Sequence, residues 1–357
     1  MTAPTGTGPA ARRTPARPGP APAAVLCGLG SWLPPTEVAN DEIAGRLGVT
    51  DDWIHQRTGV RSRHRAAPGS ATADMAVEAG ARALKSQAAE GETPPVDAVL
   101  LATATPDRLC PSTAPAVAAR LGLRGAAALD LSAACSGFVY ALSVAAGLIA
   151  ARTCARILVI GSDTMSAVLD PDDRGTAPIF GDGAGAAVLR AGDPEEPGAL
   201  GPFVLGSDGA GPLADLIHIP AGGSLTRYGY SGAHPSAHLR MDGREVFKRA
   251  MEHMGAAVTA AAARTGWDLA GVDRFAIHQA NARISRALAT RLGVPEDRWV
   301  SNIERVGNTT SASVPLLLDH AHTEGGLRPG HRVVVAAFGA GLTWGATSLV
   351  WPRLHRG

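Results

Sequence analysis

The chain has 357 residues, of which 45% are hydrophobic and 18% are charged, and its formal net charge at pH 7 is +1. This length and composition suit a globular protein with a large core or two fused domains, and the near-zero charge argues against a general nucleic-acid binder. No apolar run reaches the roughly 18 residues of a membrane-spanning helix, so we expect no membrane partner.

The first segment, residues 1–23, is rich in Pro, Ala, Thr and Gly and contains no acid, which predicts a disordered tail. Arg12 and Arg13 are followed by TPARPGPAP instead of an apolar run, so they do not form a signal peptide. The four cysteines are irregularly spaced and include no CxxC pair. This usage is typical of reduced thiols in a cytoplasmic protein and indicates no metal site.

After the tail, apolar strand patterns alternate with amphipathic helical patterns. A strand at 24–34 is followed by a helix for which Asn40 is the expected N-cap, with acids in its first turn. The pattern then predicts a further series of elements in chain order. Strands are expected at 96–106, 126–135, 155–165 and 183–192, and helices at 111–123 and 136–152. This alternation is typical of a layered α/β fold.

The second half of the chain repeats the order of the first. A strand at 272–280, a helix at 281–294 and strands at 332–341 and 342–352 are expected. Asp273 follows Asp97 by 176 positions, and Arg332 follows Arg156 by the same 176. A constant shift favours an internal duplication over chance matching of short apolar runs, with halves at 24–195 and 196–357. The strand ending at Cys135 would then correspond to 301–310, which places Asn308 opposite the cysteine.

The stretch LDLSAACSGFVYAL, residues 129–142, places Cys135 where a buried strand pattern ends and a helical pattern begins. At a helix N-terminus the dipole favours an anion and can lower a thiol pKa below its free value of about 8.5. The alternative is that Cys135 is a small buried hydrophobe.

Two further residues stand at the ends of predicted elements. His278 follows the apolar FAI at the carboxyl end of a strand, a frequent place for catalytic groups in α/β folds. Asn308 lies in the loop VGNTTSASVP, and a glycine loop, FGAG, begins at Phe338. The alternatives are a hydrogen-bonded core histidine, a turn asparagine and an ordinary strand turn.

These motifs resemble the β-ketoacyl-acyl-carrier-protein synthase III family of thiolase-fold condensing enzymes. The resemblance runs from about residue 24 to the C-terminus and rests on DDWIHQRTGVRSRH, AACSGFVYAL, DRGTAPIFGDGAGAAVL, HQANARI, VGNTTSASVP and FGAGLTWGA, in that order. It implies a five-layered αβαβα fold, a homodimer, and two pseudo-twofold-related halves. The N-terminal half carries the nucleophile, and the C-terminal half carries the histidine and the asparagine.

The resemblance also implies a reaction. Cys135 would take an acyl group from acyl-coenzyme A, a substrate and not a bound cofactor, and pass it to a carbanion formed from malonyl-acyl carrier protein. Backbone N–H groups of Cys135 and Ala340 would hold the oxyanion, although the family usually has glycine at the second place. His278 and Asn308 would stabilise the enolate.

Other reactions stay open beside condensation. A related enzyme could load a starter unit or acylate a non-carbon acceptor. A Cys-His-Asp thioester hydrolase is weakened because no acid stands beside the motifs, and a degradative thiolase is disfavoured because no cysteine follows Cys154.

Substrate contacts follow by resemblance. Trp53 and Arg57 resemble the pair that holds the adenine of coenzyme A, Arg174 matches a further contact, and Phe247 lies where the family lines its pantetheine tunnel. Packing within a helix is the alternative for Trp53.

A basic face and one loop complete the expected contacts. The face would dock an acidic acyl carrier protein, unless it is only a solvated charged surface, and consists of Lys248, Arg283, Arg286 and Arg291. The loop LCPSTAP matches one that crosses the dimer to close the partner's acyl pocket, often with a bulky aromatic. Here the residue is Cys110, so the pocket would have room for a larger or branched primer.

Overall fold

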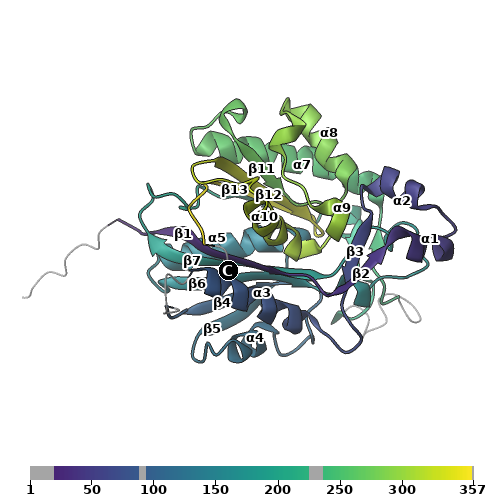
Figure 1. The fold of residues 1–357 in the computed structure, drawn as a ribbon, viewed down its shortest axis with the longest axis horizontal. Helices are drawn as coiled ribbons and strands as arrows, with labels where there is room; N and C mark the ends of the chain where they lie inside the picture. Colours follow the sequence, from purple (N-terminus) through teal and green to yellow (C-terminus); the bar gives the residue numbers. More distant parts are fainter. Residues whose placement is uncertain (1–19, 88–93, 225–235, 356–357) are drawn as a thin grey trace, which may run out of the picture.

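The computed structural model describes residues 20–87, 94–224 and 236–355. Residues 1–19 of the predicted tail lie outside this description, and Ala23 already begins the first strand. Two sheets form the centre of the molecule and helices cover them (Figure 1). In the part of the chain that is described, no helix is both long and apolar enough to cross a membrane.

The first sheet contains five strands and the second contains four. In spatial order, the first sheet consists of β1 (Ala23–Trp32), β7 (Gly183–Gly192), β6 (Arg156–Asp163), β4 (Ala98–Ala102) and β5 (Ala127–Leu131). The second consists of β8 (Val204–Ser207), β13 (Thr343–Val350), β12 (Arg332–Gly339) and β11 (Arg274–Ile277). Two short antiparallel pairs of strands accompany them: β2 (Thr36–Ala39) with β3 (Ser62–Arg65), and β9 (Ile217–His218) with β10 (Arg240–Met241).

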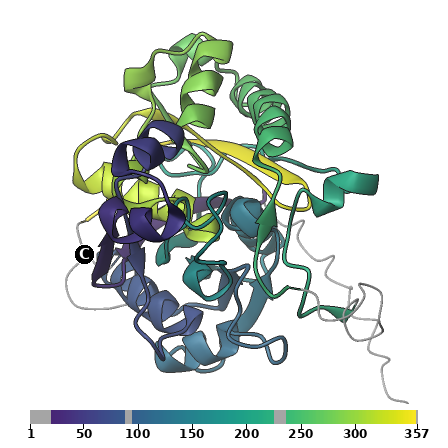
Figure 2. The same ribbon diagram turned by 90° about the vertical axis from the view of Figure 1, so that its right-hand side faces the viewer.

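Helices occupy three layers around the two sheets. The central layer contains α5 (Gly137–Ala150) and α10 (Ser313–Thr323), which share one apolar core with strands of both sheets. The outer face of the first sheet packs on α3 (Thr72–Gln87) and α4 (Ala114–Arg120), and that of the second packs on α7 (Gly243–Arg264) and α8 (Ala282–Leu292). Figure 2 shows these outer helices at the bottom and top of the molecule. The result is the expected five-layered αβαβα fold.

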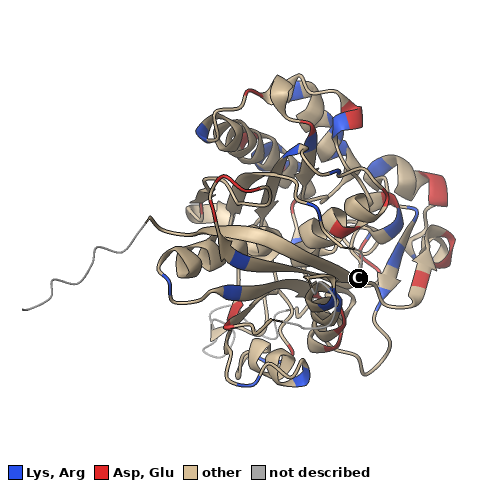
Figure 3. Cartoon of the chain, turned by 60° about the vertical axis from the view of Figure 1, so that its left-hand side comes forward, with Lys and Arg blue, Asp and Glu red and all other residues tan. Residues whose placement is uncertain are grey.

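The strands are apolar on both faces because each sheet is covered on both sides. In β4, Ala98, Leu100 and Ala102 face the central helices, while Val99 and Leu101 face α3 and α4. In β12, the odd-numbered residues 333–337 face the centre and the even-numbered residues 334–338 face α7 and α8. Charged residues accordingly lie mainly on the outer helices and loops (Figure 3).

The internal duplication is visible in both topology and hydrogen bonds. Each sheet contains the same sequence of antiparallel, antiparallel and parallel pairs, from β1 to β4 and from β8 to β11. The carboxylate of Asp97 accepts a hydrogen bond from the backbone N–H of Arg156 at 2.9 Å, and that of Asp273 accepts one from Arg332 at 2.8 Å. Both pairs are those separated by 176 positions in the sequence.

Two local predictions are wrong. Asn40 does not cap its helix, because α1 (Asn40–Leu47) has Ala39 at the N-cap and the buried Asn40 amide instead bonds to Asp51 and Arg63. The segment 301–310 contains the short helix α9 (Ile303–Val306) instead of a strand. The second sheet has no fifth strand like β5 among the described residues. A single β-bridge between Phe275 and Trp299 is found at that edge instead.

The strand that precedes Cys135 is not buried within a single chain. It ends at Leu131 as β5, the edge of the first sheet, and each of its residues is half-buried or exposed. The helix expected over 111–123 is also shorter, since α4 begins at Ala114. At this start, the carboxylate of Asp130 accepts hydrogen bonds from the backbone N–H groups of Thr113 and Ala114, both at 2.7 Å.

Candidate active site

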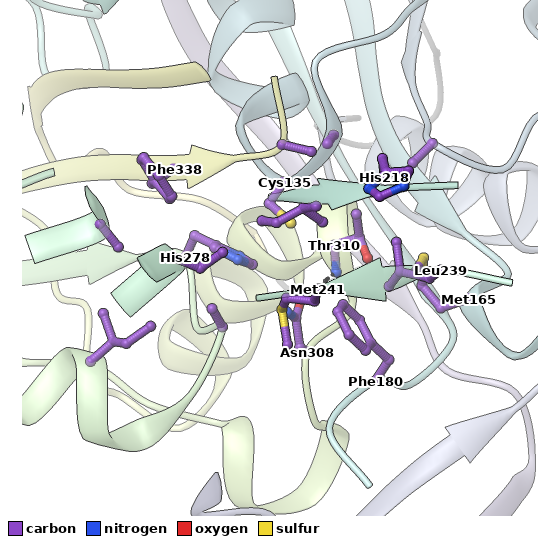
Figure 4. A pocket seen from close by; sticks show the side chains of 18 of the residues that line it. Cys135, Met165, Phe180, His218, Leu239, Met241, His278, Asn308, Thr310 and Phe338 are labelled. Carbon is purple, nitrogen blue, oxygen red and sulfur yellow. Dashed lines mark hydrogen bonds between the residues drawn. The ribbon is translucent and has the colours of Figure 1, made fainter. Parts of the chain in front are cut away.

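A cavity of about 190 Å³ lies where the two halves meet. Apolar side chains form most of its wall, and three of them are methionines, Met165, Met241 and Met254. Cys135, His278 and Asn308 all line it, although they are far apart in the sequence (Figure 4). The fold therefore brings the three residues singled out in the sequence to one place.

Cys135 lies in a tight turn, Ala134–Ser136, that leads directly into α5. Ala134 adopts a positive φ of 45°, and the Ser136 hydroxyl hydrogen-bonds to Thr343 at 2.8 Å, which ties the turn to the second sheet. The close approach of α5 requires a small residue, since a Cβ on Gly137 would lie 3.1 Å from the Ala102 side chain. Cys135 stays partly accessible, and it faces the cavity.

The thiol is neutral at pH 7. Burial raises the pKa of Cys135 to about 12, and the negative charge of the nearby Asp163 acts in the same direction. The prediction that the helix N-terminus lowers this pKa is therefore wrong. Since only the thiolate is a strong nucleophile, Cys135 needs a base that removes its proton as it attacks.

Asp163 is the acid that the sequence motifs did not reveal. It ends β6 and is completely buried. Its carboxylate accepts hydrogen bonds from the backbone N–H of Ala104 at 2.6 Å and of Ser311 at 2.8 Å, and from the Ser311 hydroxyl. These bonds hold two loops of the cavity together. None of the bonds recorded for the described residues connects Asp163 to His278, so the two do not form the base and orienting acid of a hydrolase triad.

The duplicated turns of the two halves differ in one important contact. Ala134 and Thr310, 176 positions apart, both have positive φ, 45° and 54°. The counterpart of Cys135 is therefore Ser311, three residues beyond the Asn308 expected from the sequence. The Asp163 carboxylate accepts a hydrogen bond from the N–H of Ser311. The counterpart of Asp163, 176 positions later, is Gly339, which has no side chain. A Cβ added at Gly339 would lie 2.8 Å from the Cys135 nitrogen. Only the first turn thus keeps its N–H groups clear of a carboxylate.

His278 follows β11 as predicted and is 2% exposed. Both of its ring nitrogens are buried, and neither has a hydrogen-bond partner among the described residues. Burial lowers the pKa of His278 to about 3, so the ring is neutral at pH 7. Leaving two buried nitrogens unpaired is costly, which argues against a histidine that only fills the core.

Asn308 is held by bonds on both its backbone and its side chain. The backbone N–H donates to Ile179 at 2.9 Å, and the carbonyl accepts from Gly181 at 3.0 Å. Its side-chain oxygen accepts a hydrogen bond from the backbone N–H of Thr310 at 2.9 Å. Since the oxygen is occupied, the NH₂ end is the part of the amide that remains to donate to a ligand.

Of the other residues expected to contact ligands, some line the cavity and others lie outside it. Ala340 lines the cavity with Cys135. On α2 (Asp51–Thr58), the Arg57 guanidinium stacks over the Trp53 ring, 4.5 Å from its centroid, and the exposed Arg174 lies beside Gly48 at the end of α1. Phe247 is not among the described residues that line the cavity. It is half-buried on α7 and packs against the apolar core of the second sheet, while Val246 and Ala250 of the same helix line the cavity.

The basic residues lie outside the cavity on α7 and α8. Arg283, Arg286 and Arg291 are exposed on α8, and none forms an ion pair with a carboxylate in residues 20–87, 94–224 or 236–355. Lys248 is exposed on α7 and lies 3.8 Å from Glu245. The amide of Asn281, which caps α8, donates to the Arg57 carbonyl at 3.0 Å, so this basic face adjoins α2.

Cys110 lies on the loop between β4 and α4, exposed and outside the cavity of its own chain. Its neighbour Leu109 is 84% exposed, the most exposed large hydrophobic side chain of the described residues. The expectation that Cys110 enters a partner's pocket stays a prediction.

Comparison with protein families gives two matches that together span both halves. The family described as 3-oxoacyl-[acyl-carrier-protein (ACP)] synthase III matches residues 129–209, and the family of its C-terminal region matches residues 262–351. These segments contain Cys135, His278, Asn308 and Ala340.

Individual relatives match over nearly the whole chain. Beta-ketoacyl-[acyl-carrier-protein] synthase III 3 of Streptomyces coelicolor is 52% identical over 93% of this chain and 98% of its own, and the Pseudomonas aeruginosa synthase III is 50% identical over the same shares. The crystal structure of the P. aeruginosa PAO1 enzyme has a TM-score of 0.86, with 48% identity over 93% of this chain and 99% of its own. The priming β-ketosynthase of the R1128 polyketide pathway also scores 0.86, at 35% identity, covering 96% and 100%.

Proposed function

The chain belongs to the 3-oxoacyl-[acyl-carrier-protein] synthase III family, and on that premise we propose that it condenses an acyl-coenzyme A primer with malonyl-acyl carrier protein. The reaction passes through an acyl-Cys135 intermediate and starts a fatty acid or polyketide chain. The observation that carries the proposal is the position of Cys135 in an apolar cavity beside two neutral donors, the unpaired His278 ring and the Asn308 amide.

In the loading step, Cys135 attacks the thioester carbonyl of the primer. The bond from the carbonyl carbon to Sγ forms, the bond to the coenzyme A sulfur breaks, and the thiol proton passes through His278 to the departing thiolate. The neutral ring can accept this proton because it carries none at pH 7 on one nitrogen. The N–H groups of Cys135 and Ala340 stabilise the negative oxygen of the tetrahedral intermediate.

In the condensing step, malonyl-acyl carrier protein loses carbon dioxide and leaves an enolate. The enolate carbon attacks the acyl-Cys135 carbonyl, the carbon–Sγ bond breaks, and the released Cys135 thiolate takes up one proton from water. His278 and Asn308 donate to the enolate oxygen, and both are neutral, so the enolate is stabilised without protonation of the ring.

Two measurements on the wild-type protein test this proposal. The intact mass after incubation with acyl-coenzyme A reports loading, and labelled carbon dioxide released from malonyl-acyl carrier protein reports condensation. Loading followed by transfer to an alcohol or amine, without carbon dioxide, would replace condensation with simple acyl transfer. Rapid release of the free acid would instead indicate a hydrolase, which the missing contact between His278 and an acid disfavours.

We further propose that α2 binds coenzyme A and that α8 docks the carrier protein. The stacked Trp53 and Arg57 offer an aromatic face and a cation to an adenine nucleotide. The three α8 arginines have no carboxylate partner among the described residues, and they offer positive charge to an acidic carrier, together with Lys248, which lies 3.8 Å from Glu245.

One substitution in each site should separate coenzyme A binding from carrier-protein docking. Trp53→Ala should raise the KM for acyl-coenzyme A about tenfold, through the lost stacking, and affect the carrier less. Arg283→Glu should raise the KM for malonyl-acyl carrier protein several-fold, and this effect should shrink as salt is added. Each variant is the control for the other, and a salt-independent effect of Arg283→Glu would make this residue structural.

We also propose a homodimer that covers β5 and brings Cys110 to the partner's acyl pocket. The apolar Leu129 on this edge strand is 40% exposed, and Leu109 protrudes from the adjoining loop. An unpaired strand edge is a ready surface for a second copy of the chain.

Enlarging residue 110 tests the dimer and the pocket together. Cys110→Phe should lower turnover of long or branched primers at least about tenfold more than turnover of acetyl-coenzyme A, because an aromatic ring fills space that only larger primers need. Sedimentation gives the oligomeric state. An equal loss for all primers, or a monomeric protein, would contradict the proposal.

A further inference from the structure

The cavity has two sides that differ in composition. Figure 4 shows His278 on one side of Cys135, and Thr310 and His218 toward the other, with the apolar Met165 and Leu239. Under the proposed function, an acyl group on Cys135 occupies this second side. It would meet two polar groups there, beside hydrocarbon and thioether side chains of the described residues.

His218 has a defined tautomer. It ends β9 between Ile217 and Ile219, which line the same cavity. Its Nδ1 lies 2.7 Å from the carbonyl oxygen of Asp215, and a carbonyl can only accept, so Nδ1 carries the hydrogen. In the neutral ring Nε2 is then left with a lone pair and accepts a hydrogen bond.

Thr310 supplies the second polar group. It is 3% exposed, and its hydroxyl is buried with no partner among the described residues. The backbone is held in place, since its N–H donates to Asn308 at 2.9 Å and its φ of 54° is that of the duplicated turn. Burying an unpaired hydroxyl is unfavourable, and because Thr310 lines the cavity, a ligand there can provide the missing bond.

We propose that the primer is a hydroxyacyl thioester whose hydroxyl donates to Nε2 of His218 and accepts from the hydroxyl of Thr310. A hydroxyl is the oxygen function that can do both. A keto oxygen could not donate to Nε2, and a carboxylate would find no Lys or Arg among the described residues that line the cavity. This inference rests on the proposed function and specifies its acyl substrate.

Loading rates of matched thioesters test the inference. Acylation of Cys135 is followed by intact mass with butyryl-, 2-hydroxybutyryl- and each enantiomer of 3-hydroxybutyryl-coenzyme A. At least one hydroxyacyl thioester should load with a kcat/KM at least about tenfold above that of butyryl, since a site built for a hydroxyl discriminates against its absence. Thr310→Val and His218→Leu should each bring this ratio down toward one.

Thr309→Val is the matched control. Its hydroxyl is also buried and unpaired, but Thr309 does not line the cavity, so the ratio should persist in this variant. Butyryl loading as fast as every hydroxyacyl thioester would overturn the inference while leaving the proposed function standing. A preference that survives both Thr310→Val and His218→Leu would overturn the assignment to this site. Failure of every thioester to load would instead overturn the proposed function, and the inference with it.

Discussion

Cys135→Ala is expected to abolish acylation of the protein by acyl-coenzyme A and, with it, condensation. Removing a catalytic nucleophile typically costs on the order of 10⁶ in rate, and no other cysteine lines the cavity. The variant should fold normally, because the turn is tied to the second sheet by the Ser136 hydroxyl, which hydrogen-bonds to Thr343 at 2.8 Å. The measurement is the intact mass after incubation with the primer.

Cys110→Ala is the control for this experiment, since Cys110 is the one exposed cysteine of the described residues. It should retain the mass increase. Acylation that persists at full level in Cys135→Ala, or disappears in Cys110→Ala, would refute the assignment of the nucleophile.

Asn308 is expected to matter for condensation far more than for loading. Its NH₂ group donates to the enolate, which forms only when malonyl-acyl carrier protein loses carbon dioxide. Asn308→Ala should therefore leave the mass of the acyl-enzyme nearly unchanged and lower carbon dioxide release by on the order of 10², the scale of one lost oxyanion donor.

Asn308→Asp separates donation from loop position. The aspartate can still accept the Thr310 N–H, which Asn308 accepts at 2.9 Å, but it cannot donate to the enolate. It should lose condensation at least as strongly as the alanine variant. If Asn308→Asp restored carbon dioxide release, the residue would act only through the position of the loop.

His278→Ala should differ from Asn308→Ala by also slowing loading. The sequence placed Cys135 at a helix N-terminus, where the dipole can lower a thiol pKa. Burial instead raises the pKa of Cys135 to about 12, so a base has to take its proton, and the neutral His278 lines the same cavity. Loading of His278→Ala at the wild-type rate would show that another group takes this proton.

The sequence by itself determined the order of the elements and the residues that carry the chemistry. Strands with consecutive apolar residues, such as β4 and residues 333–338 of β12, revealed sheets covered on both faces. The spacing of 176 positions between Asp97 and Asp273 revealed the duplication. Cys135, His278 and Asn308 were recognisable because each interrupts a local pattern at the end of an element, and such patterns depend only on neighbours in the chain.

Tertiary structure alone decided what those residues touch. The buried Asp163 meets Ser311 from 148 positions away, and Gly339 lies against the Cys135 nitrogen from 204 positions away. Neither contact has a signature in the local sequence, and both determine whether the N–H groups of a turn are covered or open. The error on Asn40 has the same origin, because its amide binds Asp51 and Arg63 instead of its own helix.

The sequence also could not predict the protonation states of Cys135 and His278, or that His218 and Thr310 line the same cavity. A pKa depends on how much protein surrounds a group and which charges stand near it, and a cavity exists only once the two halves have packed. Periodicity and spacing specify faces and ends of elements. Packing specifies distances between groups that are far apart in the chain, and those distances set the chemistry of the site.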